Sequence, residues 1–135
     1  MASGEWRVAS GETERPVRSY RDLKVWRKAI DFSLSVYSAT RPWPAEERFG
    51  LTSQVRRASV SVASNIAEGA ARRTTGEFRQ AIGYARGSLA EAETQLLIAQ
   101  GLGLLNQAAT TDLVQQADEI SRMLAGLISS LEEKR

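Results

Sequence analysis

Histidine and cysteine are both missing from this chain of 135 residues. Without histidine the chain lacks the usual general base near neutral pH and the usual imidazole metal ligand. Without cysteine it has no disulfide and no thiolate, which fits a reducing, cytoplasmic setting. A dinuclear metal site in a helical bundle also takes Glu-x-x-His pairs. We therefore expect a protein that is not an enzyme and that takes no metal, cofactor or small-molecule substrate.

Long apolar runs are missing as well. No stretch of about 18 apolar residues is present, so we expect no membrane span. The N-terminus has no apolar segment before a small-residue cleavage site, so we expect no secretory signal. The hydrophobic share of 42% and the charged share of 25% are typical of a soluble globular domain.

A strong excess of one charge is also absent, because the net charge is only +2. The charges are unevenly distributed, however. Residues 41–89 carry eight Arg and four Glu, whereas residues 90–135 carry three basic and seven acidic side chains. Two alternatives follow: oppositely charged faces that pair with each other or with neighbouring copies, or a basic footprint for nucleic acid.

The apolar pattern divides the chain into a tail and a helical domain. Residues 1–18 show no apolar period and predict a disordered tail. Residues 19–135 hold four amphipathic segments with helical spacing, and we expect no strands. The segments predict an all-α, antiparallel up-down-up-down four-helix bundle. We expect the first helix to start at 19–22 and to end before Pro42 and Pro44, and the second to run over 45–68 and to end at Gly69. Thr74 is the predicted N-cap of the third helix; Asn106 is the candidate N-cap of the fourth, with Thr110 or Thr111 as the alternative if that helix starts later.

The first helix has two apolar stripes on nearly opposite sides. A surface helix of a monomeric bundle needs only one, so two stripes indicate a helix covered on both sides and hence an oligomer. One stripe is Leu23, Trp26, Ile30, Leu34 and Tyr37; the other, a candidate for the oligomer interface or for a structural role, is Val25, Ala29, Phe32 and Val36.

The third helix has an unbroken heptad seam from Phe78 to Ala99. Gly83 and Gly87 lie off this seam, on a flank shared with Ala90 and Thr94. A glycine inside a helix costs roughly 0.5–1 kcal/mol relative to alanine. Close approach of another helix, including one from another subunit, would explain both glycines.

The basic candidates for binding nucleic acid or another partner are arginines, which suit phosphates because they make bidentate contacts and release counterions. Solvated surface and intersubunit salt bridges are the alternative. We expect Asn65 to fix helix register or cap a neighbouring helix, and Glu68 to form a salt bridge, with a direct binding role as the alternative. The six arginines are Arg56, Arg57, Arg72, Arg73, Arg79 and Arg86.

Four segments carry a resemblance to a known family: DLKVWRKA at 22–29, ERFGLTSQVRRA at 47–58, SNIAEG at 64–69 with Arg72 and Arg73, and GSLAEAETQL at 87–96. Over residues 19–131 the chain resembles the four-helix-bundle proteins encoded in intervening sequences of bacterial 23S ribosomal RNA genes. Relatives often have proline where this chain has Ala63, so we expect a straighter second helix.

The resemblance implies a homopentameric ring. The family is also similar to the accessory variability proteins of diversity-generating retroelements, which bind a reverse transcriptase and nucleic acid as basic pentamers. The net charge of +2 is less basic than that role favours. From the resemblance we nevertheless expect an accessory protein that binds RNA, DNA or a reverse transcriptase. The alternative is a protein-interaction scaffold without a nucleic-acid role.

Overall fold

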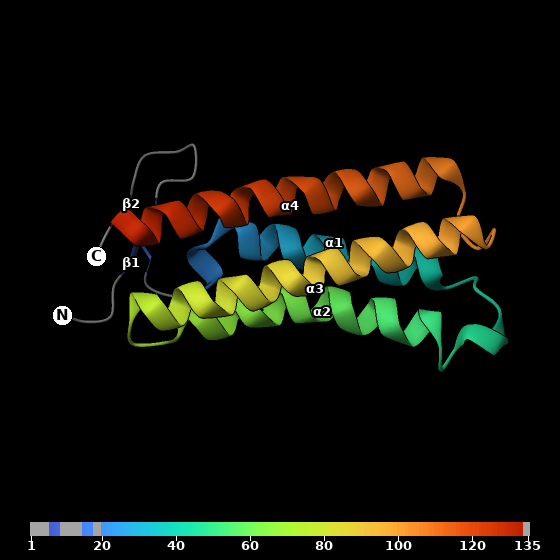
Figure 1. Cartoon of the computed structure of the whole chain (residues 1–135), viewed down its shortest axis with the longest axis horizontal. Coiled ribbons are helices and arrows are strands. Elements are labelled where there is room, and N and C mark those ends of the chain that lie inside the picture. Colours follow the sequence, from blue (N-terminus) through green and yellow to red (C-terminus); the bar gives the residue numbers. More distant parts are fainter. Residues whose placement is uncertain (1–5, 9–14, 18–19, 134–135) are drawn as a thin grey trace.

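The computed structural model describes residues 6–8, 15–17 and 20–133. Within this part the chain forms four long helices (Figure 1). Each helix packs against the next one along the chain, and the first also packs against the last. The predicted all-α four-helix bundle is therefore confirmed. The helices are α1 (Lys24–Thr40), α2 (Leu51–Ala70), α3 (Thr75–Gly101) and α4 (Gln107–Glu133).

Helices α1 and α2 both begin later than the sequence predicts. A short 3-10 helix, η1 (Tyr20–Asp22), precedes α1, and another, η2 (Ala45–Glu47), precedes α2. The Glu47 carboxylate accepts a hydrogen bond from the Leu51 N–H at 3.1 Å. This side chain satisfies one of the N–H groups that a new helix leaves unpaired, and α2 starts there instead of at Ala45.

Gly69 does not end α2, which corrects its predicted role as a C-cap. The helix continues to Ala70, and Gly69 is buried against α3. A Cβ added at Gly69 would lie 2.6 Å from the Ala81 Cβ and 3.0 Å from Cδ1 of Phe78. The glycine is needed because α2 and α3 approach too closely here for any side chain.

The two predicted N-caps are confirmed. Thr74 Oγ1 accepts a hydrogen bond from the Glu77 N–H at 3.1 Å, at the start of α3. Asn106 Oδ1 accepts one from the Ala109 N–H at 2.7 Å, at the start of α4. Between the two helices, Gly103 has φ +80°, a left-handed conformation that glycine adopts without steric strain. These local signals fix the short turns that keep the helices antiparallel.

The core lies along the bundle axis and contains the predicted seams of α3 and α4. Phe32 and Phe78 are its largest fully buried side chains. Fully burying an apolar side chain of this size contributes about 1.5–3 kcal/mol, so the seams account for much of the stability of the bundle. The seam residues buried in α4 are Leu113, Ala117, Ile120, Leu124, Leu127 and Leu131.

A short antiparallel hairpin precedes the bundle and was not predicted. Its strands are β1 (Trp6–Val8) and β2 (Arg15–Val17), and Trp6 pairs with Val17. The hairpin lies at the end of the molecule that holds the α2–α3 turn, and β1 contacts α4 (Figure 1). The expectation of a tail without strands is therefore wrong for these two segments. The remaining residues of the predicted disordered tail, 1–5, 9–14 and 18, lie outside the described residues.

Candidate functional site

The two apolar stripes of α1 differ in how far they are buried. The stripe predicted as a candidate oligomer interface, Val25, Ala29, Phe32 and Val36, is buried in the bundle's own core. On the opposite stripe Leu34 remains 63% exposed and Tyr37 41% exposed. The interface role of the first stripe is thus corrected, because α2 and α4 cover that side of α1 within one chain. The surface left for another molecule is the opposite stripe.

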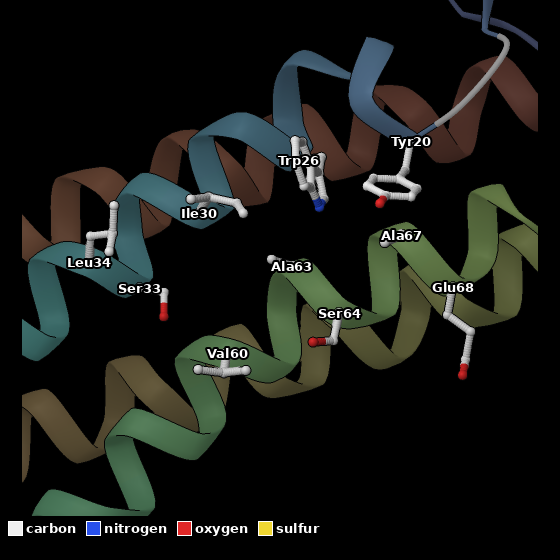
Figure 2. A pocket seen from close by; sticks show the side chains of 10 residues that line it. All are labelled: Tyr20, Trp26, Ile30, Ser33, Leu34, Val60, Ala63, Ser64, Ala67 and Glu68. Atoms are coloured by element: carbon white, nitrogen blue, oxygen red, sulfur yellow. The ribbon is translucent and has the colours of Figure 1, made fainter.

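Trp26, Ile30 and Leu34 of this opposite stripe line one wall of an apolar groove between α1 and α2, with a volume of about 590 Å³. Figure 2 shows the α1 side chains on one side and the short side chains of α2 on the other. Val60, on the α2 side, is 43% exposed. The groove is lined by Tyr20, Trp26, Ile30, Ser33, Leu34, Val60, Ala63, Ser64, Ala67 and Glu68.

Polar and aromatic contacts hold the groove walls in place. The Ser33 and Ser59 hydroxyls lie 3.2 Å apart and link α1 to α2. Arg56 Nε donates a hydrogen bond to Thr40 Oγ1 at 2.8 Å, and its guanidinium carbon lies 4.6 Å from the centre of the Tyr37 ring. These contacts join α1 to α2 at Ser33, within the groove, and at the end of α1, beyond it.

The six candidate arginines do not form one surface. Of the six, Arg72 and Arg73 are neighbours in the sequence and both are exposed, in the turn between α2 and α3. Arg72 Nη2 also lies 3.5 Å from Glu68 Oε1, within an exposed ion pair. This pair contributes little to stability because both groups are solvated.

The other four arginines lie in different surroundings. Arg56 points toward α1, as its bond to Thr40 shows. Arg57 lines a groove between α2 and α3 that also contains Glu91. Arg86 lines a hollow between α3 and α4. Arg79 is half-buried, and its Nη1 has no hydrogen-bond partner among the described residues. The seven-residue spacing of Arg79 and Arg86 predicts that both lie on one flank of the helix. It does not predict that Arg79 is half-buried whereas Arg86 is exposed.

The comparisons with known proteins fit this fold. Residues 21–126 match the model of the family described as 23S rRNA-intervening sequence protein. The chain belongs to this family. A crystal structure at 1.70 Å resolution of a protein of unknown function from the S23 ribosomal protein family, from Bacteroides thetaiotaomicron, is similar with a TM-score of 0.70. The two chains share 19% identity over 77% of this chain and 97% of the other, which supports the shared fold. No curated protein matches the chain.

In this member of the 23S rRNA-intervening sequence protein family, Asn65 joins a polar chain between α2 and α3. Its Nδ2 donates hydrogen bonds to the backbone oxygen and the hydroxyl of Ser61, at 2.8 and 2.9 Å. The Ser61 hydroxyl in turn lies 2.8 Å from that of Ser88 on α3. Asn65 therefore supports the packing of two helices of the bundle.

Gly83 and Gly87 lie on an exposed flank of α3. A Cβ added at either position would meet nothing within 4 Å. Both glycines line a hollow of about 410 Å³ on the side of α3 that faces α4, together with Ala90. The predicted close approach of another helix is therefore not made within the chain.

The acidic side chains of the part that the structure describes form no cluster that could hold a metal ion. Burial, together with the negative charge of Asp118, raises the pKa of Glu93 above its usual range. Across residues 6–8, 15–17 and 20–133, no helix is both long enough and apolar enough to cross a membrane.

The groove itself is the feature that sequence reasoning missed. The signal was present in α2, where Ala63, Ser64 and Ala67 follow Val60. Small residues were expected to allow close helix approach. In the fold they instead leave space beside the larger side chains of α1.

Proposed function

We propose that this chain is a non-enzymatic accessory protein that assembles with copies of itself and, once assembled, binds nucleic acid. The uncovered α1–α2 groove supports this proposal most directly, because Leu34 and Val60 expose large apolar surface in a single copy. Exposed apolar patches of this kind mark interaction sites in soluble proteins. A homopentamer is the assembly that the family resemblance favours.

The exposed pair Arg72 and Arg73 is the best candidate for phosphate contact. Two adjacent guanidinium groups provide charge-assisted, bidentate donors. One pair gives weak binding, but an assembly presents the pair once per subunit, and linked weak sites bind with a much higher combined affinity. RNA or DNA is therefore the proposed ligand, and a reverse transcriptase is the protein partner suggested by the similarity to retroelement accessory proteins.

Fluorescence anisotropy with a labelled RNA hairpin and a labelled DNA duplex tests the nucleic-acid part. We expect affinity to fall steeply as salt is raised, because phosphate contacts release counterions. The double variant Arg72→Glu/Arg73→Glu should bind at least tenfold more weakly than the wild type. Arg41→Glu/Arg48→Glu is the matched control, since both arginines are exposed and the net charge changes equally. Absent binding, or binding insensitive to salt, would remove the nucleic-acid role.

A protein-interaction scaffold without a nucleic-acid role is the second candidate. The scattered arginines favour it: Arg56 is engaged with Thr40, and Arg79 is half-buried. Under this alternative the wild type assembles, yet neither RNA nor DNA binds at low salt. A purified, nuclease-treated reverse transcriptase that co-elutes with the assembly would then identify the partner class.

A further inference from the structure

We infer that the groove between α1 and α2 receives the Gly83–Gly87 flank of α3 from a second copy, in a head-to-tail contact. This inference rests on the proposed self-assembly and names the two surfaces that make it. The occupant is a second copy because the flank lies on the same chain and carries complementary shape and charge.

The groove supplies an apolar receptor with side chains projecting from both walls. Leu34 projects from α1 and Val60 from α2, and both keep large exposed areas. Farther along α2, Ala63 and Ala67 leave this wall low opposite Trp26 and Tyr20 (Figure 2). A smooth helix face would cover these side chains and remove their apolar area from water, which is favourable in proportion to that area.

The α3 flank supplies a smooth face of this type. Gly83, Gly87, Ala90 and Thr94 follow one another at helical spacing and are all exposed. In the part of the chain that the structure describes, nothing requires the two glycines, since an added Cβ would meet no atom within 4 Å. Gly69 differs, because α3 itself occupies its space. The two glycines therefore lower the stability of α3 and make no close contact in return within one copy. They would be explained if projecting side chains of another copy pack into the space that they leave.

Charge complementarity favours the same pairing. Residues 20–70, which hold α1 and α2, contain eight basic and five acidic side chains. Residues 75–133, which hold α3 and α4, contain three basic and eight acidic ones. The segment that holds the groove thus has a net charge of +3 and the segment that holds the flank has a net charge of −5, so a contact between them meets less charge repulsion than a contact between two copies of the same segment. At the contact itself, Glu68 lines the groove, and Arg86 and Glu93 line the hollow beside the two glycines. Complementary potentials favour the contact between the two segments of opposite net charge.

The helix order makes the contact repeatable. The α1–α2 edge and the α3–α4 edge lie on opposite sides of the bundle, because the helices pack in the order α1, α2, α3, α4 and back to α1. Each copy therefore keeps a free groove on one side and a free flank on the other. Heterologous contacts of this type produce closed rings, or filaments when the rotation does not close.

Light scattering of the full-length protein after size exclusion tests the two surfaces separately. Leu34→Glu places a charge in the groove, and Gly87→Gln fills the flank. We expect each variant to run as a folded monomer where the wild type assembles. The controls are Leu102→Glu, at a side chain that is 62% exposed outside the groove, and Gly126→Gln, at an exposed glycine of α4. Circular dichroism checks that each variant keeps its helix content.

Mixing the two monomeric variants gives the decisive measurement. Leu34→Glu keeps an intact flank and Gly87→Gln keeps an intact groove, so an equimolar mixture should form a one-to-one dimer and nothing larger. If either variant assembles like the wild type, or if the mixture stays monomeric, the inferred contact is wrong while self-assembly stands. A wild type that is monomeric throughout would instead overturn the proposed self-assembly itself.

Discussion

Replacing Gly69 by alanine tests the closest helix contact in the bundle. The added Cβ would lie 2.6 Å from the Ala81 Cβ, 3.0 Å from Phe78 Cδ1 and 3.3 Å from the Phe78 carbonyl oxygen. Carbon atoms pack best at about 3.5–4.0 Å. The Ala81 Cβ is attached directly to the backbone, so it cannot rotate away. Helices α2 and α3 must therefore separate locally by roughly 1 Å.

Two opposing effects set the change in stability. Overpacking a tight core site costs typically about 1–3 kcal/mol. Alanine in a helix gains about 0.5–1 kcal/mol over glycine, and the gain is smaller near a helix end. Gly69 is the penultimate residue of α2, so the gain lies at the lower end of this range. We expect Gly69→Ala to lower the free energy of unfolding by about 1–2 kcal/mol.

Urea unfolding monitored by far-ultraviolet circular dichroism measures this change. Gly126→Ala is the control, because its Cβ would meet nothing within 4 Å, and it should raise stability by about 0.5–1 kcal/mol. Each variant is measured at two protein concentrations, since assembly changes apparent stability. Ala81→Gly should be less damaging in the Gly69→Ala background than in the wild type. A Gly69→Ala protein as stable as the wild type, with no such coupling, would refute the close-contact role.

Two further substitutions test local contacts by the same unfolding measurement. Arg56→Lys should lose about 1 kcal/mol, since lysine lacks the Nε donor that binds Thr40 Oγ1; an unchanged stability would contradict that role. Glu93 has a raised pKa, so its contribution to stability is greatest at low pH and is lost as pH rises through that value. Glu93→Gln should therefore be more stable than the wild type at pH 7, and the difference should vanish where both side chains are neutral.

The fold could be predicted from the sequence because its signals are local. The heptad seam that starts at Phe78 defines a buried face from spacing alone. Thr74 and Asn106 lie where a helix must satisfy unpaired N–H groups, and both side chains do so in the structure. Two positions needed tertiary information. Glu47 delays the start of α2, and Gly69 has the residue type of a helix end but lies against a neighbouring helix.

The candidate site could be predicted only in part, because its location depends on which stripe of α1 faces the core. Both stripes contain large apolar residues, and spacing ranks neither above the other. The choice depends on packing: Phe32 fits completely between the other helices, whereas Leu34 does not. Sequence periodicity thus indicated that α1 carries more apolar surface than one bundle can cover, and only the arrangement of α2 and α4 showed where the excess lies.

The scattered arginines give the proposed assembly a second consequence beyond covering apolar surface. Among the six candidate arginines, one copy offers a single exposed pair, Arg72 and Arg73, beside which Glu68 already neutralises part of the charge. The counterion release from so few phosphate contacts is small, so one copy would bind nucleic acid weakly at physiological salt. Repetition of the pair around an assembly raises the effective concentration of each further contact without any new residue. We therefore expect the affinity of the proposed assembly for nucleic acid to fall when the groove is blocked, although the groove contains no arginine.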